Sequence, residues 1–446
     1  MMRIKTKAVR AALLLAGVGA VLQPGMALAQ KDKKGAEAAP KIQLSDGFRK
    51  VAQPAQTALQ AKKWAEAEPL VAAAEAAAKT DDDKFYAQQF RLQLIDGQLV
   101  ERANGDANVY AQGEAALVGP LDALIANPKL PQDARARFLY KRGQIEYGAK
   151  RYKEAIGFFD RAREAGFSDR NLTLNIAQAR AESGDLTGAA TAIRTAIDAE
   201  KAAGRKAPLE WYRYARSKVA QAKLNAQVNE WSLLIVKDYP TAKHWREAVL
   251  LYGFNGAASP QLDKRAKIDL WRLLRVNKAL ADQGDYIEYA GDLGDVGLGA
   301  EAKAVIDEGR AAGKIPASSG PANMVYSDAQ KQIASDGPIE GLAKRAQAAP
   351  NGGPAAATGD LALGTGNYAR AIELYKLALS KGGVKVDEVN THLAMAQALS
   401  GDKASAKATF ALVKTPPRSD IAGYWVAWLD QAGPTTQGDP ADAAGQ

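Results

Sequence analysis

A pattern of small and large apolar residues that returns after 34 positions constrains the fold of this chain more than any other feature. The segment 152–162 reads YKEAIGFFDRA, and the segment 186–196 reads LTGAATAIRTA. The first alanine of the pattern moves from Ala155 to Ala189, which is a step of 34 residues. A period of this length is typical of paired-helix repeats. Such pairs stack into a solenoid, and the usual product of a solenoid is a binding surface.

The same arrangement occurs in four units of the sequence. The first helix of each pair carries a small residue where the second helix crosses it, and a glycine-containing turn joins the two. The marker residues of the four units are Gly143, Ala155, Phe159 and Ala162; Ala177, Ala189, Ile193 and Ala196; Gly359, Ala371, Tyr375 and Ala378; and Ala394, Ala406, Phe410 and Val413. These residues resemble the tetratricopeptide repeat over about a third of the chain. The resemblance implies an all-α solenoid of antiparallel helix hairpins with a right-handed superhelical twist.

Composition between residues 43 and 432 favours helix throughout, because Ala, Leu, Arg, Lys, Gln and Glu predominate. Two segments rich in Pro, Gly and Ser, 314–328 and 348–358, interrupt the helical pattern. They indicate either a joint between two arrays or two long loops between helices. The divisions that we expect are a helical array over 43–312, a loop-flanked helical joint over 313–358, repeats with a terminal helix over 359–432, and a disordered tail over 433–446.

The terminal helix of the last array has apolar residues at three- and four-residue spacing, which is typical of one face lying on a neighbouring helix. These residues are Ile421, Tyr424, Trp425, Trp428 and Leu429. A cap on the last repeat is the favoured interpretation, and a docking helix is the alternative. Without a cap the ends of a solenoid expose apolar faces, so self-association is compatible with the sequence.

The first 29 residues have the pattern of an export signal. A basic stretch is followed by the apolar run 11–22 and by the small residues Ala27 and Ala29, which predicts cleavage after Ala29. Residues 30–42 then read as a flexible tether. No second apolar segment of membrane-spanning length follows. We therefore expect a mature protein without a transmembrane segment, located in a bacterial periplasm.

Charge and cysteine content exclude several classes of function. The formal charge of +9 falls to about +5 when the four cations of the signal are removed, and the remaining charges are interspersed along the chain. A nucleic-acid-binding protein needs a clustered basic surface, so no nucleic-acid partner is expected. The absence of cysteine removes disulfides, thiol catalysis and cysteine-ligated zinc. We expect no cofactor and no metal.

Catalytic signatures are missing from the sequence. His244 and His392 are the two histidines, and each is more typical of a packed or surface side chain than of a general base or metal ligand. Phosphate-binding and nucleophile motifs are absent. A pair of carboxylates of the glycosidase kind stays open as an alternative, because carboxylates are plentiful.

The resemblance implies that the first helix of each repeat faces a concave binding surface. The residues that it places there are Arg137, Tyr140, Gln144 and Tyr147 in one repeat, Asn171, Leu174, Gln178 and Glu182 in the next, and Thr391 and Met395 near the C-terminus. Arg, Tyr, Gln and Asn side chains suit an extended peptide, whose backbone amides need polar partners. The sequence therefore predicts a non-catalytic scaffold that binds protein partners of the cell envelope.

A cluster of tryptophans supports a different hypothesis. Trp211, Trp231, Trp245 and Trp271 fall within 61 residues. They would line an aromatic bowl that binds or hydrolyses cell-wall glycan, or they would form the core of a segment that lacks the small-residue pattern. The core interpretation is favoured.

Overall fold

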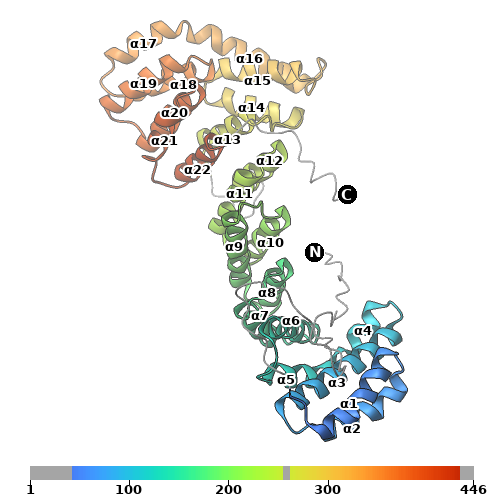
Figure 1. The fold of residues 1–446 in the computed structure, drawn as a ribbon. Helices are drawn as coiled ribbons and strands as arrows, with labels where there is room; N and C mark the ends of the chain where they lie inside the picture. The colour runs from blue at the N-terminus through green and yellow to red at the C-terminus, as the bar shows by residue number, and fades with distance from the viewer. Residues whose placement is uncertain (1–42, 255–261, 432–446) are drawn as a thin grey trace, which may run out of the picture. The chain divides into compact units, whose positions relative to one another are not determined.

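The computed structural model describes residues 43–254 and 262–431, and every regular element within these ranges is a helix (Figure 1). The predicted all-α architecture of stacked helix hairpins is confirmed. The predicted signal at 1–29, the tether at 30–42 and the tail at 433–446 all lie outside the described residues. The chain divides into two compact units, the first ending at Ala196 and the second beginning at Ile197.

The N-terminal unit is a succession of hairpins in which consecutive helices pack on each other, most extensively α6 on α7 and α1 on α2. Its helices are α1 (Asp46–Gln60), α2 (Trp64–Ala77), α3 (Asp81–Ala103), α4 (Ala107–Gly113), the short 3-10 helix η1 (Glu114–Leu117), α5 (Val118–Ala126), α6 (Gln132–Gly148), α7 (Tyr152–Glu164), α8 (Arg170–Glu182) and the first part of α9 (Leu186–Ala202).

Close helix crossing explains the small residues of the repeat. A Cβ atom built on Gly143 of α6 would lie 2.4 Å from the ring of Phe159 on α7, and Phe159 is fully buried. A second hairpin repeats the geometry, because a Cβ on Gly359 would lie 2.7 Å from the ring of the buried Tyr375. The glycine thus lets the aromatic residue of the partner helix sit directly on the backbone. This contact is the packing unit that the 34-residue pattern encodes.

The turn within each hairpin needs a residue in the left-handed region. Gly366 has φ +77°, and the side chain of Asn367 after it accepts a hydrogen bond from the backbone N of Arg370, which caps the next helix. Other hairpins place a lysine where a glycine is expected. Lys150 has φ +60° in the turn between α6 and α7. Lysine in this conformation is strained, because its Cβ atom comes too close to the carbonyl oxygen that follows it.

The C-terminal unit contains the rest of α9 and thirteen further helices within the described residues. They are α10 (Leu209–Gln221), α11 (Asn225–Asp238), α12 (Ala242–Gly253), α13 (Lys264–Val276), α14 (Gln283–Asp295), α15 (Gly299–Ala311), α16 (Gly320–Asp336), α17 (Ile339–Ala348), α18 (Gly353–Gly364), α19 (Tyr368–Lys381), α20 (Val386–Leu399), α21 (Lys403–Phe410) and α22 (Arg418–Leu429).

The unit boundary at residue 196 differs from the boundary expected near residue 312. The segment 313–358 contains α16 and α17, which pack on α15 and α18 respectively. Ala322 and Ala329 of α16 join the same apolar core as the helices before them. The Pro- and Gly-rich stretches lie inside one unit, and each consists of a short turn followed by the beginning of a helix, α16 in the first stretch and α18 in the second.

Helix α22 closes the C-terminal unit. It packs against α20 and α21, which precede it, and also against α11 and α13, which lie far earlier in the sequence (Figure 1). Ile421, Tyr424 and Trp425 are fully buried. The helix therefore caps the last repeat and also joins it to α11 and α13. No helix among the described residues is long and apolar enough to cross a bilayer.

Candidate functional site

The residues predicted from the first helices of two adjacent repeats lie together in the N-terminal unit. Arg137, Asn171 and Glu182 are exposed, and Tyr140, Gln144, Tyr147, Leu174 and Gln178 are partly exposed. Helices α6 and α8, which carry them, contact each other. We call this surface the α6–α8 face, made of Arg137, Tyr140, Gln144, Tyr147, Asn171, Asn175, Gln178 and Glu182.

Tyr140 is held in place at the centre of the α6–α8 face. Its ring stacks on Phe167 with 4.4 Å between the ring centroids, and its hydroxyl accepts a hydrogen bond of 2.8 Å from Nδ2 of Asn175. Burial, followed by the negative charge of Asp169, raises the pKa of Tyr140 to about 12. The hydroxyl is therefore neutral at physiological pH. The stacking contact fixes the position of the Tyr140 ring, and the hydrogen bond from Asn175 fixes the orientation of its hydroxyl.

Asn175 is a member of this face that sequence reasoning missed. It lies four residues after Asn171 and three before Gln178, so helical spacing places it on the same side of α8. Its partner Tyr140 is 35 residues earlier, which is close to one repeat period. The repeat period and the helical spacing together were enough to identify Asn175 from the sequence.

The α6–α8 face offers neutral donors and acceptors beside an ordered aromatic ring. Amide side chains such as Gln144 and Gln178 both donate and accept, which matches the paired N–H and C=O groups of a peptide backbone. A ring such as that of Tyr140 contributes apolar contact area at a small entropic cost. Arg137 forms an exposed ion pair of 3.0 Å with Asp133. The face therefore combines neutral hydrogen-bonding groups, an ordered aromatic ring and an exposed ion pair.

The prediction for Thr391 is wrong. This residue of α20 is fully buried, and its hydroxyl donates a hydrogen bond of 2.6 Å to the backbone oxygen of Asp387. Met395, one turn further along, is also fully buried. The first helix of this repeat lies under α22 and beside α13 side chains, so its inner side is covered.

The four clustered tryptophans belong to the core of the C-terminal unit. Trp211 and Trp231 are 3% exposed, Trp271 is 1% exposed and Trp245 is fully buried. Trp271 stacks on Tyr289 at 6.0 Å between centroids. Residues buried to this degree do not line an open bowl. The aromatic-bowl hypothesis is therefore wrong for these four tryptophans. The helices of this segment lack the small-residue pattern, and the tryptophan side chains fill the spaces between them.

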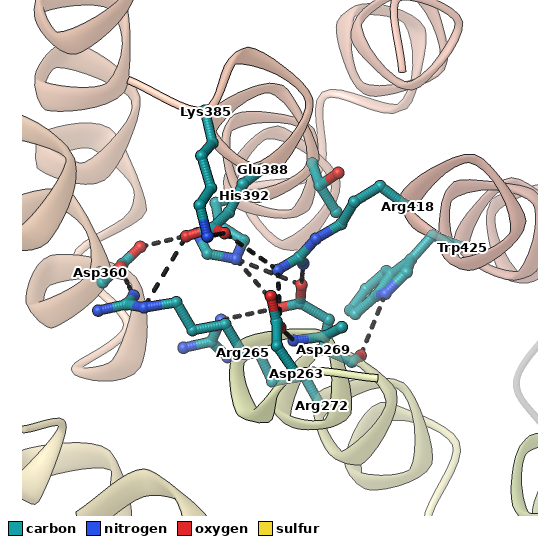
Figure 2. A network of polar contacts seen from close by, with 12 residues as sticks. Asp263, Arg265, Asp269, Arg272, Asp360, Lys385, Glu388, His392, Arg418 and Trp425 are labelled. Atoms are coloured by element: carbon teal, nitrogen blue, oxygen red, sulfur yellow. Dashed lines mark hydrogen bonds and ion pairs between the residues drawn. The ribbon is translucent and has the colours of Figure 1, made fainter. Parts of the chain in front are cut away.

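A second polar cluster lies buried in the C-terminal unit, and Figure 2 shows it at close range. Its centre is Asp269 of α13, which is fully buried. Around it lie side chains from α13, α15, α18, α20 and the first residue of α22. We call this cluster the Asp269 network, made of Arg265, Asp269, Arg272, Glu301, Asp360, Glu388, His392 and Arg418.

Both ring nitrogens of His392 face carboxylates in the Asp269 network. Nδ1 lies 2.8 Å from Oδ1 of Asp360, and Nε2 lies 3.2 Å from Oδ1 of Asp269 (Figure 2). Burial alone would disfavour the charged imidazole, but the two carboxylates outweigh it and raise the pKa of His392 to about 9. Burial likewise opposes ionisation of Asp269, yet His392 and Arg418 lower the pKa of that carboxyl to about 2.

Arginines complete the network. Arg272 donates to Oδ1 of Asp269 at 3.2 Å and to Oε2 of Glu301 at 2.6 Å. Arg265 donates to Oδ2 of Asp360 at 2.5 Å. Arg418 pairs with Asp269 and reaches Oε2 of Glu388 at 3.3 Å.

The charged groups of the Asp269 network keep one another ionised in spite of their burial. Asp269 and Asp360 have lowered pKa values, because cations surround them. The raised pKa of His392 in turn favours its protonated form. The carboxylates are engaged by cations, which is the arrangement that makes buried charge tolerable. Within the described part of the chain no group of His, Asp or Glu side chains is arranged to hold a metal ion.

Comparison with known proteins leaves the family open. No protein-family model matches the chain, and no curated protein matches it. One similar solved structure is described as Naa15/Naa10 bound to HypK-THB. The match has a TM-score of 0.28 and 11% sequence identity, and it covers 83% of this chain and 69% of that chain. At this TM-score the similarity carries no argument about what the present chain binds.

Proposed function

We propose that this protein is a non-catalytic scaffold of the bacterial cell envelope that binds segments of protein partners on the α6–α8 face. The observation that carries the proposal is the ordered pair of Tyr140 and Asn175 on a surface that is open to solvent. A hydroxyl held by a 2.8 Å hydrogen bond and a ring stacked at 4.4 Å lose little freedom on binding.

An extended peptide fits the chemistry of the face. Its backbone groups would pair with the amides of Gln144 and Gln178, and an apolar side chain would lie against Tyr140. Arg137 and Glu182 carry opposite charges at the margin and would select among sequences through charge.

The periplasmic location rests on the predicted signal at 1–29. Cell fractionation of the full chain with a C-terminal tag tests it, together with the N-terminal sequence of the recovered protein. The expected N-terminus is Gln30. Recovery of the uncut chain from the cytoplasm would contradict the location while leaving the binding face untouched.

Partner capture tests the binding face. The tagged protein is recovered from gently crosslinked envelopes, and bound proteins are quantified for the unaltered chain and for the double variant Tyr140→Ala and Gln144→Ala. The matched control is Tyr326→Ala with Gln330→Ala, which removes the same residue types at the same spacing from α16 of the C-terminal unit. We expect the first variant to lose a partner that the control retains. Equal capture by all three proteins would contradict the proposal.

A further inference from the structure

A hollow of about 630 Å³ lies on the surface of the N-terminal unit, where α2 begins beside the second half of α3. A second hollow of about 520 Å³ adjoins it, because Lys62, Trp64 and Glu101 line both. We call the two hollows together the Trp64 groove, and the residues that define it are Lys62, Trp64, Gln98, Val100, Glu101 and Arg102. The groove shares no residue with the α6–α8 face, so it is a separate candidate for ligand binding.

An ordered aromatic ring lies in the Trp64 groove. A Cβ atom built on Gly97 of α3 would lie 2.3 Å from the ring of Trp64, which repeats the close glycine–aromatic contact of the α6–α7 hairpin. The aromatic residue of that hairpin, Phe159, is fully buried, whereas Trp64 packs on the apolar core and remains partly exposed. Val100, three residues after Gly97, is 50% exposed and lines the same groove. The groove therefore presents apolar surface whose position is fixed by the backbone of α3.

The charges that line the Trp64 groove balance one another. Three are positive and three are negative, and they belong to Lys62, Lys63, Arg102, Glu66, Asp96 and Glu101. Lys63 and Glu66 form an ion pair of 3.1 Å with each other. A lining of this kind attracts neither anions nor cations in preference, so the charge distribution favours a neutral ligand.

The polar groups that remain free in the groove suit hydroxyl groups. Within residues 43–254 and 262–431, the side chains of Lys62, Glu101 and Arg102 form no ion pair and no hydrogen bond. A hydroxyl donates to a carboxylate and accepts from an ammonium or guanidinium group, so a ligand rich in hydroxyls pairs with both signs of charge. The exposed amide of Gln98 both donates and accepts, which matches an acetamido group.

We propose that the Trp64 groove binds a glycan chain built from N-acetylated amino sugars. A sugar ring whose substituents are equatorial has a flat face of C–H groups, and this apolar face packs on an aromatic ring. In the groove the sugar ring lies on Trp64, its hydroxyls pair with Lys62 and Glu101, and its acetamido group pairs with Gln98. This site is additional to the protein-binding function of the α6–α8 face and does not depend on it.

Fluorescence quenching locates the bound glycan, because five of the seven tryptophans are at most 3% exposed. Trp64 and Trp428 are partly exposed, so acrylamide quenches these two in preference. Chitotetraose, a linear chain of N-acetylglucosamine, should cover Trp64 and lower the quenching of the unaltered chain. A fall is also expected in Trp428→Phe, whereas Trp64→Phe should show none. Unchanged quenching at millimolar chitotetraose, an equal fall with the polyol mannitol, or a fall that persists in Trp64→Phe would overturn the proposal.

Calorimetry of the full chain measures the affinity for chitotetraose. Trp64→Ala should weaken binding by about tenfold, because the stacked ring is lost. Since Trp64 also packs on the core, the double variant Gln98→Ala and Glu101→Ala tests the groove through two exposed residues. It should also weaken binding by about tenfold, through the loss of hydrogen bonds to the sugar.

The matched control is Gln227→Ala with Glu230→Ala, which removes the same residue types at the same spacing from α11 of the C-terminal unit. This control should bind chitotetraose as the unaltered chain does. Equal affinity in the groove variant and the control would contradict the site. If the groove variant loses a captured protein partner while the unaltered chain does not bind chitotetraose, the groove serves a protein and the glycan proposal fails.

Discussion

The same positions of the repeat are open in the N-terminal unit and closed in the C-terminal unit. Relative to the small residue at the helix crossing, the next position is Gln144 in α6, Asp360 in α18 and Met395 in α20. Gln144 is partly exposed, whereas Asp360 is 4% exposed and Met395 is fully buried. Three positions before the small residue, the partly exposed Tyr140 corresponds to the buried Thr391.

The difference teaches that the repeat determines how two helices pair but not what covers the pair. Gly143 and Gly359 make the same contact with an aromatic ring. In the C-terminal unit α13 and α22 then supply the partners of α18 and α20, and the polar positions become internal. Internal polar positions must be paired, and the Asp269 network is the result.

The largest expected effect comes from removing the centre of the network. Asp269→Ala removes a carboxylate that Arg272, His392 and Arg418 share, and the loss of this buried negative charge should lower the free energy of unfolding by about 3–5 kcal/mol. Tryptophan fluorescence during urea unfolding reports the C-terminal unit almost alone, because six of the seven tryptophans lie after residue 196. Asp328→Ala is the control, since it removes an exposed ion pair of 2.8 Å and should cost less than about 1 kcal/mol. Similar losses in the two variants would show that the network is not buried as described.

A smaller effect tests whether both units share the hairpin contact. Gly143→Ala and Gly359→Ala each force a Cβ against an aromatic ring, and each should destabilise its own unit by about 1–3 kcal/mol. Urea unfolding followed by circular dichroism measures the loss for Gly143→Ala, and urea unfolding followed by tryptophan fluorescence measures the loss for Gly359→Ala. Gly157→Ala in α7 is the control, because among the described residues no atom lies within 4 Å of its Cβ position, and helix propensity should stabilise it by about 1 kcal/mol. A loss in one unit alone would break the equivalence of the repeats.

The smallest effect concerns the turns. Lys150→Gly relieves a lysine at φ +60° and should stabilise the N-terminal unit by about 1 kcal/mol. Gly366→Ala makes the opposite change at φ +77° and should destabilise the C-terminal unit by a similar amount. Thermal unfolding of the two variants measures both shifts. Changes of the same sign would mean that the two turns are not equivalent.

Much of the local structure was predictable, because each repeat carries its own signal. Gly143 with Phe159 and Gly359 with Tyr375 were identified as crossing positions, and the structure places them in contact. The turn at Lys150 gave no such signal, since lysine is not a residue that the left-handed conformation favours.

The closed site was not predictable, because its members are distant in the sequence and share no period. Asp269 and His392 are 123 residues apart, and Asp269 and Arg418 are 149 apart. Thr391 was assigned to an open face because its position matches that of Tyr140. The covering by α22 depends on the path of the whole C-terminal unit, which no local pattern records.

Thiol labelling tests the central contrast most directly, because the chain contains no cysteine and a single introduced thiol reports one position. Gln144→Cys and Met395→Cys occupy the same repeat position in the two units. The structure predicts that Gln144→Cys reacts with a maleimide at nearly the rate of a free thiol, whereas Met395→Cys reacts only as fast as the C-terminal unit opens. Rapid labelling of both variants in the folded protein would contradict the contrast between an open and a closed face.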